Sequence, residues 1–216
     1  MIMHDGFSAL TQIEINSHII ASLLYVLAGM LLNSKNGKLR FYRPLQIACY
    51  ATAIAQLSIT AFKAGWITNN TVTLIDISHL GIWAIALWRL LENSTGQAVK
   101  TTFKTSIILV WIISSLLFVN KTQAWLPSFT ASHMSLLIGP ILLTLIILAL
   151  IEQLFRNSAR PHRHNLRFLG IGLLVMMFSE LYSLAYQGVF QAIDITSNNA
   201  EGFIHSLIGL LFIVGS

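Results

Sequence analysis

The chain has 216 residues, of which 55% are hydrophobic and only 10% are charged, and its mean hydropathy is +0.72. This composition cannot cover a soluble globule with a polar surface, so it excludes the ordinary soluble classes and favours a membrane protein. The formal net charge of +5 is then a signal of membrane orientation and of attraction to lipid headgroups, and no nucleic-acid partner is expected.

Seven apolar segments follow one another along the chain. Each approaches the roughly 20 residues that are needed to cross about 30 Å of hydrocarbon. Helices are required there because lipid offers no partner to backbone N–H and C=O groups. The sequence therefore predicts an all-α fold, in which residues 1–216 form a single seven-transmembrane-helix bundle. The expected helices lie at about 16–32, 44–62, 72–91, 101–119, 131–154, 166–190 and 202–216.

Basic residues predict how the bundle is oriented. Eleven of the thirteen Lys and Arg residues lie in or beside the gaps after the first, third and fifth segments. They are Lys35, Lys38, Arg40, Arg43, Arg89, Lys100, Lys104, Arg156, Arg160, Arg163 and Arg167. Because cytoplasmic loops retain Lys and Arg, this pattern predicts a multi-pass membrane protein with its N-terminus outside and its C-terminus inside.

The seventh segment is shorter than the others. From Gly202 to Ser216 there are fifteen residues, or about 22 Å of helix, which does not comfortably cross the hydrocarbon. We expect the natural polypeptide to continue beyond Ser216. A tilted or half-inserted terminal helix is the alternative.

Polar side chains inside the apolar segments are the candidate functional residues. Glu180 lies near the middle of the sixth segment, where a carboxylate is costly and should face the bundle interior. It either contacts a ligand or switches a signal, or it makes an interhelical hydrogen bond that fixes packing. Small residues beside His205, at 202 and 209, should let a neighbouring helix approach closely. The candidates for ligand sensing or signalling are Glu180, Asp76, His79, His205, Tyr182, Gln187 and Gln56.

Four histidines lie near the outer starts of odd-numbered segments, and so at similar depth. They are His18, His79, His133 and His205. They could serve as metal ligands or as pH-responsive groups around an outward-opening pocket. Since no HxxxH or HxxE pair occurs on any segment, a plain polar cavity is preferred to a metal site. No metal or other cofactor is predicted for this chain.

Several function classes lack their motifs. Residues 203–216 contain no Lys for a retinal Schiff base, which argues against a photoreceptor. No GxSxG, HExxH or Walker A pattern occurs, so this chain itself is expected to be non-catalytic.

The last third of the chain resembles a known family. The residues that carry the resemblance are Ile151–Asn157 (IEQLFRN), Leu166–Leu173 (LRFLGIGL), Glu180–Tyr182 (ELY) and Glu201–Phe203 (EGF). Over about residues 150–214 the chain resembles the N-terminal membrane domain of PrsK-type sensor histidine kinases, which belong to the PEP-CTERM and exosortase system. In this family an acidic residue precedes Leu-Tyr, and Glu180 occupies that position.

The resemblance implies a longer protein of the bacterial inner (cytoplasmic) membrane and a signalling role. A cytoplasmic protein-histidine kinase core would follow residue 216 and would bind ATP and Mg²⁺, and the protein would form a homodimer that acts on a response regulator. We therefore expect a sensory domain that passes a stimulus through its sixth and seventh helices. The alternatives are a seven-helix membrane enzyme with an outer-leaflet His/Asp metal site, such as a lipid hydrolase, and a small transporter.

Overall fold

A computed structural model describes residues 2–34, 39–96, 98–123, 133–157, 163–190 and 195–215. These residues form seven α-helices and no strand, so the predicted all-α fold and the number of helices are confirmed. The helices are α1 (Ile2–Ser34), α2 (Leu39–Lys63), α3 (Asn69–Thr95), α4 (Thr101–Gln123), α5 (His133–Asn157), α6 (Arg163–Phe190) and α7 (Ile195–Gly215).

Several helices are longer than the apolar segments that predicted them. The largest differences are at the starts of α1 and α7, which begin at Ile2 and Ile195 and not near residues 16 and 202. Hydropathy marks only the part of a helix that can lie in hydrocarbon. Polar residues such as Glu, Gln and Ser extend a helix beyond that part at little cost in intrinsic propensity, so the apolar segments gave bounds that were too short.

Six of the helices contain a stretch that is long and apolar enough to cross a membrane. These stretches are Gln12–Leu32, Tyr42–Lys63, Asn69–Thr95, Thr101–Asn120, Leu136–Asn157 and Phe168–Phe190. The apolar part of α7 that the structure describes, Ala200–Val214, is shorter. The chain therefore has the length and composition of a multi-pass helical membrane protein with six clear candidate spans.

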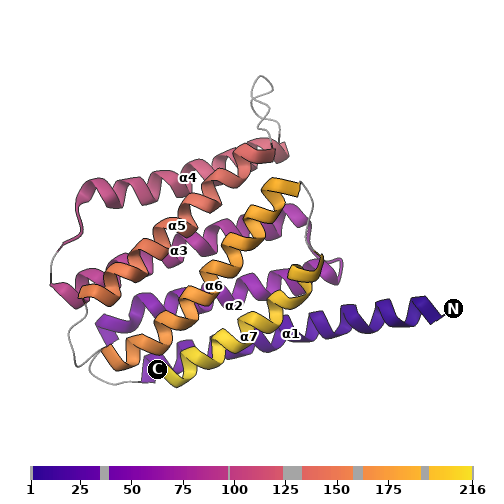
Figure 1. Ribbon diagram of the computed structural model, residues 1–216, viewed down its shortest axis with the longest axis horizontal. Helices are drawn as coiled ribbons and strands as arrows, with labels where there is room; N and C mark the ends of the chain where they lie inside the picture. Colours follow the sequence, from indigo (N-terminus) through magenta and orange to yellow (C-terminus); the bar gives the residue numbers. More distant parts are fainter. Residues whose placement is uncertain are drawn as a thin grey trace.

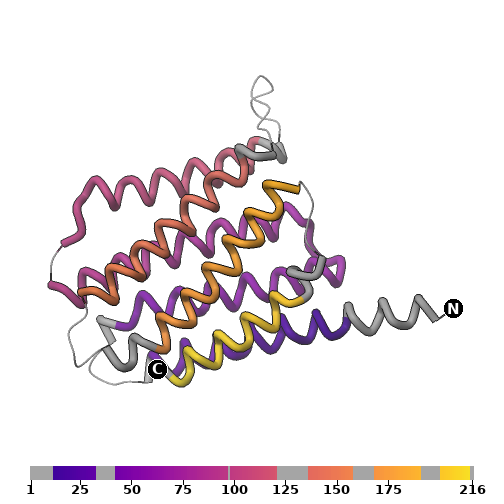
Figure 2. Tube along the Cα trace, in the orientation of Figure 1, coloured from indigo at the N-terminus to yellow at the C-terminus, as the bar shows by residue number. Residues whose placement is uncertain are grey.

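The helices form a ring with one helix outside it. Contacts join α1, α2, α3, α5, α6 and α7 in that order, and α7 returns to α1. Helix α4 packs against α3 and α5 on the outside of this ring. Successive helices run in opposite directions, so that the odd-numbered helices all begin at the same end (Figures 1 and 2). Among the six spans α3 is the most buried and α4 the least.

Three aromatic side chains from different helices fill the interior of the ring. Phe212 of α7 makes edge contacts with Tyr25 of α1 and Trp83 of α3, at centroid distances of 5.7 and 5.8 Å. All three are almost completely buried. The indole N–H of Trp83 donates to Thr52 Oγ1 of α2 at 2.9 Å, so this buried donor is satisfied. These contacts connect α1, α2, α3 and α7.

The predicted close approach at the start of α7 is confirmed. A Cβ atom added to Gly202 would lie 3.0 Å from the backbone nitrogen of His18 on α1, and one added to Gly209 would lie 2.8 Å from Cβ of Leu24. Only a residue without a side chain lets the two backbones come so near. The two glycines therefore fix the face of α7 that packs on α1.

Candidate functional site

Ionisable and polar side chains from five helices gather at the end of the ring where the odd-numbered helices begin. We call this group the polar cluster. It consists of Glu14 and His18 of α1, Gln56 and Lys63 of α2, Asp76 and His79 of α3, Glu180 of α6, and Glu201 and His205 of α7. Such groups are expensive inside a membrane bundle, so they are expected to face its interior and to be paired with one another.

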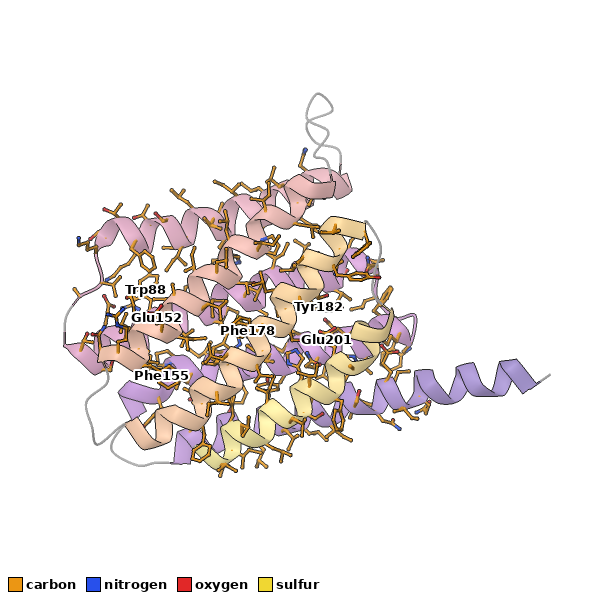
Figure 3. The ribbon with its side chains drawn as sticks, viewed as in Figure 1. Trp88, Glu152, Phe155, Phe178, Tyr182 and Glu201 are labelled. Carbon is orange, nitrogen blue, oxygen red and sulfur yellow. The ribbon has the colours of Figure 1, made fainter. Side chains whose placement is uncertain are left out.

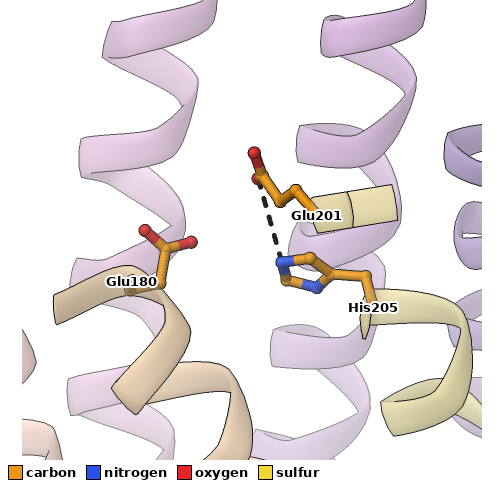
Figure 4. Close-up of side chains that lie close together, drawn as sticks. All are labelled: Glu180, Glu201 and His205. Atoms are coloured by element: carbon orange, nitrogen blue, oxygen red, sulfur yellow. Dashed lines mark ion pairs between the residues drawn. The ribbon is translucent and has the colours of Figure 1, made fainter. Parts of the chain in front are cut away.

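The centre of the cluster lies between α6 and α7. The side chains of Glu180, Glu201 and His205 point toward one another (Figure 4), and one possible ligand atom from each lies within 4.8 Å of the others. Nε2 of His205 is 3.9 Å from Oε1 of Glu201, its neighbour one helical turn earlier. His205 is buried, whereas the two glutamates are partly exposed. Two carboxylates and one imidazole thus converge on a common point.

The other face of the His205 ring contacts the core. Its Nδ1 lies 3.4 Å from the hydroxyl of Tyr25, and this hydroxyl in turn donates to Sδ of Met176 at 3.6 Å. The single proton of this hydroxyl can serve only one of the two neighbours. When it goes to sulfur, the phenol oxygen accepts from Nδ1–H, and Nε2 of His205 then carries the free lone pair.

Helices α1 and α2 contribute two further pairs of polar side chains to the cluster. Nδ1 of His18 lies 2.7 Å from Oε1 of Gln56, and since an amide oxygen only accepts, Nδ1 carries the proton. Lys63 forms an ion pair with Glu14 and also interacts electrostatically with Glu201. These contacts connect α1 to α2 and bring Lys63 of α2 near α7.

Helix α3 contributes two residues to the cluster, Asp76 and His79, which stand three residues apart and so share one face of the helix. Asp76 interacts electrostatically with both Glu180 and Glu201, and His79 lies close enough to His205 to act on it in the same way. His79 is only 4% exposed. Its Nε2, like that of His18, is buried and has no hydrogen-bond partner among the described residues.

Negative charge is in excess in the cluster. Its carboxylates are those of Glu14, Asp76, Glu180 and Glu201, and its one ammonium is that of Lys63. Buried charges that are not compensated cost several kcal/mol each in a low-dielectric interior. Asp76, Glu180 and Glu201 are partly exposed, which reduces this cost, and taking up protons or sharing a cation would reduce it further.

Most residues that the sequence nominated lie in this cluster, and some do not. His18, Gln56, Asp76, His79, Glu180 and His205 are brought together. The Gln187 amide donates to Ser183 on its own helix at 3.3 Å, and Tyr182 is 56% exposed and contacts the ring of Tyr186. The side chain of His133 lies outside the described residues.

The sequence interpretation missed four members of the site and its surroundings, which are Glu14, Lys63, Glu201 and Tyr25. A signal for two of them was present, because Glu14 and Glu201 each stand four residues before a histidine and so share its helix face. The patterns HxxxH and HxxE place histidine first, whereas in these two pairs the glutamate precedes it. Tyr25 stands seven residues after His18 and therefore lies on the same face of α1.

The fold and the polar cluster define a multi-pass α-helical membrane protein with an ionisable site inside the bundle. Comparisons with protein-family models, with curated proteins and with solved structures gave no match. The function is therefore argued from the chemistry of the cluster and from the position of α6 and α7.

Proposed function

We propose that this chain is a membrane-embedded sensory domain in which the polar cluster detects a stimulus and passes it on through α6 and α7. The observation that carries the proposal is the convergence of Glu180, Glu201 and His205 between these two helices. The same cluster also connects α7 to α1, α2 and α3. A change of charge or occupancy there acts on several helices at once.

The energy available in the cluster is large enough for signalling. Adding or removing one charge inside a membrane bundle is worth several kcal/mol. A two-state equilibrium shifts tenfold for about 1.4 kcal/mol of differential interaction. Even a fraction of the electrostatic energy at this site is therefore sufficient to change the relative populations of two arrangements of α6 and α7.

We further propose that α7 leads into the kinase core of a two-component histidine kinase. The resemblance of residues 150–214 to PrsK-type sensors supports this and a place in the bacterial inner membrane. The asymmetry of Lys and Arg along the chain supports it too, because it favours an N-terminus outside and a C-terminus in the cytoplasm. The core would bind ATP and Mg²⁺. The protein would act as a homodimer on a response regulator.

The test is Glu180→Gln in the full-length protein reconstituted in nanodiscs, with autophosphorylation as the readout. Glu152→Gln is the matched control, because Glu152 is exposed near the opposite end of the bundle (Figure 3). We expect at least about a threefold change in basal or stimulated autophosphorylation for the Glu180 variant and none for the control. Unchanged activity of a well-folded Glu180→Gln protein would remove the cluster from signalling.

A second candidate function is favoured by the same convergence. Two carboxylates and an imidazole within 4.8 Å are ligand types found in metal hydrolases, so a membrane enzyme that cleaves lipids is the alternative. Incubation of the purified protein with radiolabelled phospholipid and Zn²⁺ separates the two. Product release that is lost in His205→Gln would favour the enzyme.

A further inference from the structure

We infer that Glu180, Glu201 and His205 form a binding site for a divalent transition-metal cation of the Zn²⁺ class. This names a ligand for the sensory site proposed above and rests on that proposal only for its signalling role. The cation would lie between α6 and α7, with carboxylate oxygens from both helices and Nε2 of His205 as its ligands.

The geometry of these three groups is close to that of a metal site. A tetrahedral zinc ion with bonds of about 2.0–2.1 Å holds its ligand atoms about 3.4 Å apart. The three candidate atoms lie within 4.8 Å of one another, so they need to approach by about 1 Å or somewhat more. Glu180 and Glu201 are partly exposed and can make this movement by rotating their side chains, while His205 stays in place.

The surroundings of His205 resemble the support that metal-binding histidines usually have. A ligating imidazole normally donates its other N–H to a neighbouring acceptor, which fixes the tautomer and the orientation of the ring. Here Nδ1 of His205 lies 3.4 Å from the hydroxyl oxygen of Tyr25, which accepts from Nδ1–H when its own proton goes to Sδ of Met176. A cation bound at Nε2 would hold His205 in this tautomer.

An independent observation comes from His79. Its ring is 4% exposed, its Nε2 has no hydrogen-bond partner among the described residues, and it lies near enough to His205 to interact with it electrostatically. A buried imidazole nitrogen without a partner is destabilising. His79 is not one of the residues whose ligand atoms converge, so it would meet a cation through a bound water, as a neighbour of the site and not as a direct ligand.

Charge also favours a cation, and the ligand types favour a transition metal. Asp76 adds a further carboxylate that interacts with Glu180 and Glu201, and Lys63 is the one ammonium in the cluster. Ca²⁺ and Mg²⁺ prefer sites built from oxygen alone. The imidazole of His205 shifts the preference to Zn²⁺ and to similar divalent first-row ions.

The experiment measures metal retention by the purified 216-residue protein in nanodiscs, so it does not depend on any kinase activity. The protein is stripped with a chelator, loaded with ZnSO₄ and desalted, and zinc and protein are then quantified. We expect about one zinc per chain for the wild type and for Glu152→Gln, and a loss of at least about tenfold in affinity for Glu201→Gln and His205→Gln, since removal of even a supporting hydrogen bond costs 10–100-fold. Tyr25→Phe should weaken zinc binding by about tenfold without abolishing it.

Co²⁺ provides a second measurement on the same proteins. Cobalt bound by nitrogen and oxygen in a four-coordinate site gives strong visible absorption, which should appear in the wild type and disappear in Glu201→Gln. Glu201 is partly exposed, so this variant is expected to fold, and size-exclusion elution confirms it. A wild-type protein that retains no zinc, or equal retention by Glu201→Gln, would overturn the metal site.

The two proposals fail in different ways. If the protein binds zinc as expected but the full-length form shows the same autophosphorylation with and without zinc, the metal site stands and its sensory role is refuted. If the protein binds no zinc but Glu180→Gln changes its activity, the metal site is refuted and the sensory role of the cluster stands, with protons in place of the cation.

Discussion

Phe212→Ala tests whether α7 packs in the ring as the structure shows. The Phe212 ring is 1% exposed and contacts both Tyr25 and Trp83. Truncation to alanine removes about 100 Å³ of side chain, and at about 24 cal/mol per Å³ the unfilled cavity costs about 2 kcal/mol. The loss of stability should be smaller than the largest losses measured for Phe→Ala in the cores of soluble proteins. In a membrane the unfolded chain is also surrounded by apolar lipid tails, so burying the Phe ring gains less.

The assay is reversible unfolding in mixed micelles of a mild detergent and SDS, followed by near-ultraviolet circular dichroism. Phe203→Ala is the matched control, since Phe203 lies on the same helix and is 63% exposed. Its loss should stay within about 0.5 kcal/mol. The packing of α7 deduced here is refuted if the two variants lose equal stability, or if Phe203→Ala loses more.

Three further predictions concern packing, charge and topology. Gly202→Leu should lower the free energy of unfolding by about 1–3 kcal/mol in the same assay, because the new Cβ would meet the α1 backbone. Ala200→Leu, at an exposed position of α7, should leave the free energy of unfolding unchanged. Glu92→Gln should cost about 1 kcal/mol, since the Glu92 carboxylate accepts from the Trp88 indole and the Val99 amide and pairs with Lys104; an equally stable variant would contradict this. Green fluorescent protein fused after residue 216 should fluoresce in bacterial cells, and a dark fusion with full expression would reverse the proposed orientation.

The number of helices was predictable because lipid imposes one solution on an apolar chain. A segment of about 20 apolar residues must be helical in hydrocarbon, and each predicted segment corresponds to one helix of the structure. The bounds were less predictable. Residues 2–15 form the first part of α1 although their hydropathy is low, since a helix does not need to end where the hydrocarbon ends.

The arrangement of the helices could not be read from the sequence. Periodicity shows that Gln56 shares a face with Cys49 and Ala53 on α2, but it does not show that this face meets His18 of α1. The position of α4 outside the ring has no sequence signal either. All the segments are apolar over much of their surface, so lipid-facing and helix-facing sides look alike.

Phe212 is expected to take part in the proposed signalling as well as in stability, because it lies on α7 between the polar cluster and the end of the helix. His205 is in the polar cluster and Phe212 is seven residues later, about 10 Å along α7, where Tyr25 and Trp83 enclose it. A displacement of His205 should therefore tilt α7 about the enclosed Phe212 ring, since close-packed interiors resist sliding. In the full-length protein Phe212→Ala should then reduce the change in autophosphorylation that Glu180→Gln causes, which a double-mutant cycle measures as non-additivity. Additive effects of the two substitutions would mean that the signal leaves the cluster through α6 and not through α7.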